Sequence, residues 1–200
     1  MVSPSLLRAA DLLDRAADGI AWIGKGACWL ILAILVAVLI SIVGGMMRVT
    51  SFAEWGTEVF LLGDGLSLNA LLEIQWHLFG VMLMLTGAYA LHENRHVRVD
   101  VLSSRFSPRV ALIVETIGDL ILLLPLCIVM VERSWPLLEL AWRMGERSNE
   151  DGLTDRWLVK SFVPLGFVLL GLLGATRIAR NILTLIGAPP RQPVETSHGR

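Results

Sequence analysis

Long apolar stretches separated by polar segments dominate the pattern of this chain. The first runs from Gly26 to Met47, and no charged residue lies between Lys25 and Arg48. A helix needs roughly 20 apolar residues to cross a bilayer core about 30 Å thick. The stretch therefore predicts a membrane-spanning helix at about residues 26–47.

Three further apolar stretches predict spans at about residues 68–91, 109–131 and 161–184. Ser67 can cap the second helix, and Ser107 followed by Pro108 is typical of a helix start. The fourth stretch reaches full length only if Arg177 and Arg180 extend their side chains to the membrane surface.

The N-terminal segment, residues 1–25, has a two-sided pattern instead. Charged residues occupy one helical face and apolar residues the other: Arg8, Asp11, Arg15 and Asp18 against Leu6, Leu13 and Ala17. This predicts an amphipathic helix along the membrane surface, with a short solvated helix as the alternative. Its acidic residues argue against a cleaved signal peptide. The predicted fold is an all-α integral membrane protein with this interfacial helix, four transmembrane helices within residues 26–186 and a tail at 187–200.

The composition agrees with a membrane protein. Hydrophobic residues make up 54% of the chain and charged residues 18%, whereas soluble globular proteins carry about 25% charged residues. The net charge of −1 argues against a nucleic-acid partner. Cys28 and Cys127 both lie inside apolar runs, which is typical of small buried side chains rather than of a disulfide or a metal site.

The distribution of basic residues predicts the orientation. Segments 1–25, 92–109 and 177–200 hold eleven Lys and Arg, against six in segments 48–73 and 132–160. Cytoplasmic loops carry the excess of basic residues in membrane proteins. We therefore expect a multi-pass protein of the bacterial inner membrane with both termini in the cytoplasm.

The segment after the second span begins with HENRH, which matches the H-E-x-x-H pattern of zinc proteases. That chemistry needs both histidines one turn apart on a helix, a third ligand, and the Glu as base. Here apolar and polar residues begin to alternate at His96, so the helix is expected to end within the motif. Asp100 or Asp119 could supply a third ligand, but nothing in the sequence favours either. An intramembrane zinc protease is kept as the alternative function.

Two neighbouring stretches, NALLEIQWHLFG and HVRVDVLSSRFSPR, resemble the small membrane (Q) subunit of tripartite ATP-independent periplasmic (TRAP) transporters. The later stretch SNEDGLTDRWLVKSFVPLGFVLL resembles the last outer loop and fourth span of that family. Together they cover roughly residues 67–175. In the family pattern His96 belongs to the motif, but His92 and Glu93 do not. Thr154 and Leu173 depart from residues common in the family, which leaves the subtype open.

The resemblance implies a non-catalytic scaffold without a cofactor, metal or substrate site of its own. Its partners would be a large membrane (M) subunit, which carries the sodium and substrate sites, and a periplasmic binding protein that delivers an organic acid. Sodium would drive uptake. A self-sufficient small carrier is a third hypothesis, but the chain has no broken-helix pair or inverted repeat that would favour it.

Several residues are candidates for a subunit interface or a structural role. The loop motif supplies His96, Arg98 and Asp100, which the resemblance singles out. A row of small residues on the first span and a stripe on the second could each pack against a partner or within the chain: Ala33, Ala37, Ser41 and Gly45, then Glu73, His77, Gly80 and Gly87.

Glu115 and Asp119 are one helical turn apart on the third span. Asp119 lies about 15 Å along the helix from Arg109, which places it deep in the membrane. An isolated carboxylate there costs at least about 2.5–3.5 kcal/mol. We therefore expect it to be protonated, to face a polar crevice, or to pair with an arginine of the 92–109 loop or of a partner. A proton relay is the alternative.

Overall fold

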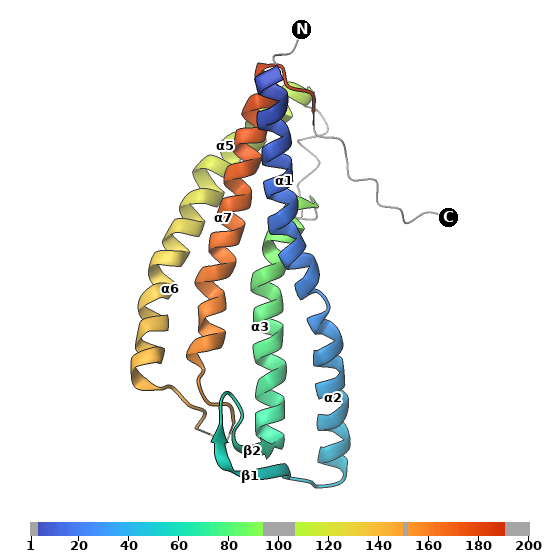
Figure 1. Cartoon of the computed structure of the whole chain (residues 1–200), viewed down its shortest axis with the longest axis vertical. Coiled ribbons are helices and arrows are strands. Elements are labelled where there is room, and N and C mark those ends of the chain that lie inside the picture. Colours follow the sequence, from blue (N-terminus) through green and yellow to red (C-terminus); the bar gives the residue numbers. More distant parts are fainter. Residues whose placement is uncertain (1–3, 94–106, 150–151, 191–200) are drawn as a thin grey trace, which may run out of the picture.

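The computed structural model describes residues 4–93, 107–149 and 152–190. Over these ranges the chain is a tall helical bundle with a small β-hairpin at one end (Figure 1). In chain order the elements are α1 (Pro4–Ala27), α2 (Leu30–Met46), β1 (Ser51–Val59), β2 (Gly63–Ser67), α3 (Leu68–His92), α5 (Pro108–Gly118), the π-helix η1 (Asp119–Leu123), α6 (Leu124–Met144) and α7 (Trp157–Ile186).

Four helical segments are long and apolar enough to cross a membrane: Pro4–Met46, Leu68–His92, Pro108–Met144 and Trp157–Ile186. The predicted class, an all-α membrane protein with four spanning helices, is therefore confirmed. The start of α1 and the end of α7 lie at one end of the bundle, and the hairpin lies at the other (Figure 1). We call these the terminal end and the hairpin end.

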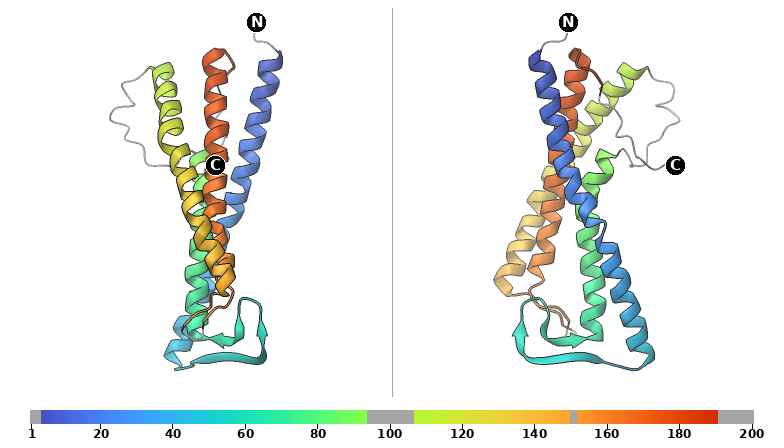
Figure 2. Two further views of the ribbon diagram at one scale, coloured as in Figure 1. Left: turned by 90° about the vertical axis from the view of Figure 1, so that its left-hand side faces the viewer. Right: turned by 45° about the vertical axis from the view of Figure 1, so that its right-hand side comes forward.

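The N-terminal helix belongs to the bundle rather than lying apart from it. α1 is nearly continuous with α2, since only Cys28 and Trp29 separate them, and it packs along α3 and α7 (Figure 2). Small buried residues allow this close approach. A Cβ atom at Gly24 would lie only 2.6 Å from the Cβ of Tyr89 on α3. The α1 helix is therefore packed closely against α3.

The third helical segment is longer than its apolar stretch. The helix continues past the predicted end near residue 131 to Met144, where Gly145 ends it with a left-handed backbone, φ 55°. Gly is the residue that adopts this C-terminal conformation most easily. The connection to α7 is therefore shorter than the predicted outer segment 132–160.

The hairpin is an element that the hydrophobic pattern did not predict. β1 and β2 pair antiparallel, with irregular register. The indole Nε1 of Trp55 donates to the carbonyl oxygen of Gly63, 2.9 Å away, and Gly63 has a φ of 63°. This hydrogen bond fixes the hairpin across its turn.

Glycines let the helices approach closely in the centre of the bundle. A Cβ at Gly166 on α7 would lie 2.7 Å from the carbonyl oxygen of Met84 on α3. A Cβ at Gly174 would lie 2.7 Å from Leu123 at the end of η1. The core of this region is formed by Ala17, Ala88, Leu91 and Leu173. α7 is therefore pressed against both α3 and the third helical segment.

Candidate functional site

At the hairpin end, the carboxylate of Glu73 on α3 fastens the connection that precedes α7. It accepts hydrogen bonds from Ser148 Oγ at 2.6 Å, from the backbone N–H of Leu153 at 2.9 Å and from Arg156 Nη2 at 2.8 Å. Leu153 is 1% exposed. A Cβ atom at Gly152 would clash with Glu73 Oε2. The loop is thus folded tightly around one carboxylate.

His77 and Glu73 do not pair through their side chains. The Nδ1 atom of His77 instead donates to the backbone carbonyl oxygen of Glu73, 2.6 Å away. This bond lies within α3, and the carboxylate is directed to the loop. The two residues of the predicted stripe therefore have separate local roles.

The hairpin is joined to the same connection by an exposed ion pair. Two guanidinium nitrogens of Arg147 donate to the two carboxylate oxygens of Glu58, at 2.7 and 3.0 Å. The backbone N–H of Thr154 donates to Leu61 at 3.1 Å. Hydrogen bonding and charge attraction from Arg147 lower the pKa of Glu58, and the same contacts raise the pKa of Arg147.

Nearer the terminal end, an arginine of α7 neutralises the buried carboxylate of the third segment. Arg177 Nε donates to Asp119 Oδ2 at 2.6 Å, and its Nη2 donates to Oδ1. Arg177 Nη1 also lies 3.3 Å from Glu115 Oε1. The side chain of Asp119 is 7% exposed. The expected arginine partner exists, but it comes from α7 rather than from the 92–109 loop.

A second arginine of α7 binds α1. Arg180 Nε lies 3.1 Å from Asp14 Oδ1, and its other nitrogens donate to Thr184 Oγ1 and to the carbonyl oxygen of Pro189, each at 3.0 Å. Arg180 is 8% exposed. The prediction that Arg177 and Arg180 extend to the membrane surface is therefore wrong. Each side chain turns inward because a carboxylate of a neighbouring helix lies within reach.

These groups surround a cavity between α1, α3, α5 and α7. Its volume is about 260 Å³, and its polar lining includes Asp14, His92, Glu115, Arg177 and Arg180. His92 closes one side, where its Nε2 lies 2.9 Å from Asp18 Oδ1 on α1. Asp14 and Asp18 of α1 thus bind groups on α7 and α3, whereas Arg15 and Asp11 pair with each other at the surface.

The structure describes only the first two residues of the HENRH stretch. α3 ends at His92, and Glu93 follows as its C-cap. His96, Arg98 and Asp100 lie outside the described residues, so the structure says nothing of their positions. Among the residues it does describe, no group of three His, Cys, Asp or Glu side chains could hold a metal ion.

The small-residue row divides into two halves. Ala37 and Ser41 are buried against α3, where Gln75 Nε2 donates to Ser41 Oγ at 2.6 Å. Ala33 and Gly45 are exposed. The middle of the row therefore packs within the chain, and its two ends do not.

The two glycines of the α3 stripe lie beside open space. A Cβ atom at Gly80 or at Gly87 would meet no atom within 4 Å. The sequence had no signal for Gly166 and Gly174, which make the close contacts instead. Their neighbours come from distant parts of the chain.

The family model for the DctQ component of tripartite ATP-independent periplasmic transporters matches residues 61–184. The chain belongs to the DctQ family. The match extends from the hairpin turn through most of α7, so it includes both the Glu73 loop contacts and the Asp119–Arg177 pair. No curated protein and no solved structure matches the chain. This DctQ component is therefore a multi-pass membrane protein and one part of a transporter that works with other subunits.

Proposed function

We propose that this DctQ-family chain is the non-catalytic small membrane subunit of a TRAP-type secondary transporter. In this role it holds a large membrane (M) subunit in place while sodium drives uptake of an organic acid. A periplasmic binding protein delivers the substrate. The observation that carries the proposal is the family match over residues 61–184.

The pairing of charges within the bundle supports a scaffold role. Asp119 and Arg180, both buried, bind groups on neighbouring helices, and Glu73 is enclosed by its loop. Ion pairs between helices fix their relative positions, because moving one helix would leave a buried charge without its partner. Such a bundle is suited to staying rigid beside a moving subunit.

Small residues beside open space are suited to contact with that subunit. Gly80 and Gly87 leave open space on α3, and Ala33 and Gly45 are exposed on α2. Small residues allow two transmembrane backbones to approach closely. We place these four residues at contacts with M, and His96, Arg98 and Asp100 at its cytoplasmic side.

We place the protein in the inner membrane with the terminal end in the cytoplasm. The excess of basic residues in segments 1–25, 92–109 and 177–200 supports this orientation. Impermeant thiol labelling tests it on a variant without Cys28 and Cys127. Cysteines at Asp64 and Asn149 should react from outside, and one at Ser104 should not; the opposite pattern would reverse the orientation.

The transport role is tested by reconstitution. The chain, a large membrane (M) subunit and a periplasmic binding protein of the same transporter are placed together in a proteoliposome assay with candidate organic acids. Uptake should need all three proteins and an inward sodium gradient. Undiminished uptake by vesicles that lack this chain would contradict the scaffold role.

A further inference from the structure

Two charged side chains project from the middle of the third helical segment. Glu132 and Arg133 on α6 are both exposed, and within the described part of the chain neither forms a hydrogen bond or an ion pair. The residues of α6 that are buried against α7 include Cys127, Ser134 and Ala141. By helical spacing, Glu132 lies on the opposite side of α6 and Arg133 on its flank, with Val129 and Pro136 between them.

Two contacts between α6 and α7, one on each side of Glu132 and Arg133, show which part of α7 lies beside these charges. Cys127 lies 3.2 Å from the Cβ position of Gly171, and the rings of Trp142 and Trp157 are 4.3 Å apart. α6 and α7 run antiparallel (Figure 1). Because Arg133 follows Cys127 by six residues, it lies level with Leu165, six residues before Gly171.

That level lies within the uncharged parts of the neighbouring helices. Gly166, next to Leu165, contacts Met84 on α3. No Asp, Glu, Lys or Arg occurs at 161–176 of α7 or at 74–91 of α3. Along α6, Arg133 is about 13 Å from Trp142, which is farther than an arginine side chain can reach. On the hairpin-end side, the nearest charged residues are Glu139, about 9 Å along α6 from Arg133, and Lys160, about 7.5 Å along α7 from Leu165. Glu132 and Arg133 therefore lie within the apolar part of the bundle, nearer its hairpin end.

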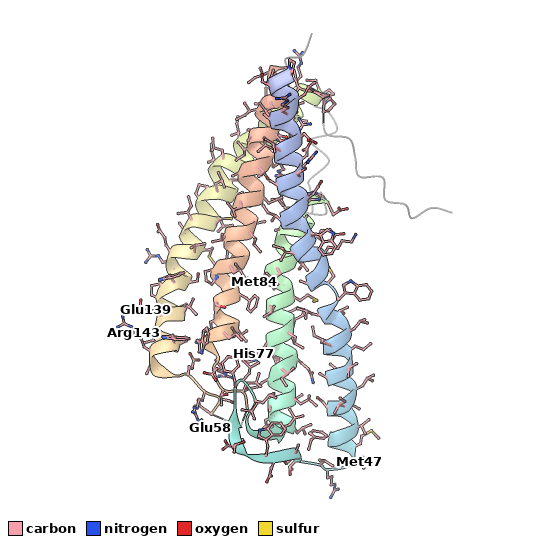
Figure 3. The ribbon with its side chains drawn as sticks, viewed as in Figure 1. Met47, Glu58, His77, Met84, Glu139 and Arg143 are labelled. Carbon is pink, nitrogen blue, oxygen red and sulfur yellow. The ribbon has the colours of Figure 1, made fainter. Side chains whose placement is uncertain are left out.

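A third polar group lies on the same side of α6. Pro136 is inside the helix, and proline has no N–H to give to the carbonyl four residues earlier. That carbonyl belongs to Glu132. Farther toward the hairpin end, Glu139 and Arg143 on this side pair with each other (Figure 3). On this side of α6, the charges nearer the hairpin end pair with each other, whereas Glu132 and Arg133 do not.

Lipid is a poor neighbour for this surface, because charges and free carbonyl groups are strongly disfavoured in the hydrocarbon region. We propose that the α6 surface formed by Val129, Glu132, Arg133 and Pro136 packs against a transmembrane helix of the large subunit. That helix carries a carboxylate for Arg133 and a hydrogen-bond donor for Glu132. This inference rests on the proposed function and adds the face and the chemistry of the contact.

Co-purification from membranes tests the charges. Wild type and variants are co-expressed with the large membrane protein, and the amount of that protein retained per chain is measured after detergent washing. The Arg133→Ala variant should retain at least about tenfold less of the large protein than wild type. A loss of this size is expected when one partner of a buried charge pair is removed. Arg133→Lys should recover part of the loss. Arg143→Ala is the matched control, since its exposed side chain pairs with Glu139, and it should retain the wild-type amount.

Photocrosslinking identifies the neighbour directly. A photoreactive amino acid at Val129 should form an adduct with the large protein in the wild-type complex. Adducts only with lipid or with a second copy of this chain, together with wild-type retention by Arg133→Ala and Glu132→Gln, would overturn the inference while the complex itself stands. If the wild-type chain retains no large protein, the proposed function falls and this inference falls with it. The thermal unfolding of Arg133→Ala alone should equal that of wild type, which separates a lost contact from misfolding.

Discussion

Arg177 of α7 binds both carboxylate oxygens of Asp119, and Asp119 is the first residue of the π-helix η1. A π-helical turn widens a helix and shifts the side chains that follow it. The ion pair therefore joins α7 to the third helical segment at the point where that segment changes geometry. The carboxylate of Glu115, one helical turn earlier, contacts the same guanidinium group of Arg177 at 3.3 Å.

Arg177→Ala should lower the free energy of unfolding of the chain by about 3–5 kcal/mol, because it leaves the carboxylate of Asp119 buried without its partner. Unfolding in mixed micelles measures the change. Arg15→Ala is the control: its pair with Asp11 is exposed, so the expected loss is about 0–1 kcal/mol. A double exchange, Asp119→Arg with Arg177→Asp, should recover part of the stability. Equal, small losses for Arg177→Ala and Arg15→Ala would contradict a structural role for the pair.

The hydrophobic pattern was sufficient to predict the spans but not their partners. A run such as Gly26–Met47 has one low-energy arrangement in a bilayer, so its helix follows from composition alone. The pairing of Asp119 with Arg177 depends on which helices are neighbours and on their relative heights. Those features are set by side-chain packing at positions such as Gly166 and Gly174, whose contact residues are distant in sequence. The sequence therefore left open whether Asp119 is protonated, faces a polar crevice or pairs with an arginine, and it did not single out Arg177.

Polar surroundings explain the other differences. Of the charged face predicted on α1, Arg15 and Asp11 are exposed and pair with each other, whereas Asp18 contacts His92 of α3. Asp14, outside that face, contacts Arg180 of α7. An amphipathic pattern shows that one face needs polar neighbours, and it does not identify them. The hairpin has no strong apolar alternation, and its shape depends on contacts such as the Trp55 hydrogen bond.

Gly166→Ala should destabilise the chain by about 1–3 kcal/mol, because the added Cβ would meet the backbone of Met84 at 2.7 Å. A backbone atom cannot move aside as a flexible side chain can. Gly80→Ala is the matched control on α3, where the new atom enters open space. It should be neutral or slightly stabilising, since Ala favours helix over Gly by about 1 kcal/mol. Thermal unfolding in detergent compares the two, and similar melting curves would contradict the close packing of α3 and α7.

Glu73→Gln should loosen the connection between α6 and α7, because the carboxylate binds Ser148, Leu153 and Arg156 at once. A hydrogen bond to a charged group contributes about 1.5–3 kcal/mol to stability. Arg156 is partly exposed, and solvent weakens its contribution, so a total loss of about 2 kcal/mol is expected. Limited proteolysis within residues 145–156 is the measurement. Glu139→Gln, at an exposed pair, should leave the cleavage rate unchanged. Equal cleavage of both variants would show that Glu73 does not hold the loop.

The contact between the hairpin and this connection should weaken in acid. The pKa of Glu58 is lower in the folded protein than its ordinary value because Arg147 binds its carboxylate. Its contribution is therefore fully present above the ordinary glutamate pKa of about 4.3 and is lost as the pH falls through the lower folded value. Arg147 stays charged throughout. The stability difference between wild type and Glu58→Gln should vanish over that range, and it should be absent at every pH in an Arg147→Ala background. A difference that persists in that background would assign the effect to another partner of Glu58.

The Glu93→Gln variant decides between two hypotheses for the HENRH stretch: a structural connection and a zinc-protease site. Glu93 follows the last residue of α3, and His92 already contacts Asp18. If the stretch is a cytoplasmic connection of the transporter subunit, this substitution should leave uptake nearly unchanged. Arg98→Ala and Asp100→Ala should instead impair assembly, because both belong to the motif that resembles the family pattern. At a buried contact with the M subunit, the loss of one charged partner would cost about 3–5 kcal/mol. Uptake and zinc content are measured side by side for the three variants. About one zinc per chain, together with a Glu93→Gln variant that is inactive, is the result expected of a metalloprotease base and would replace the scaffold reading.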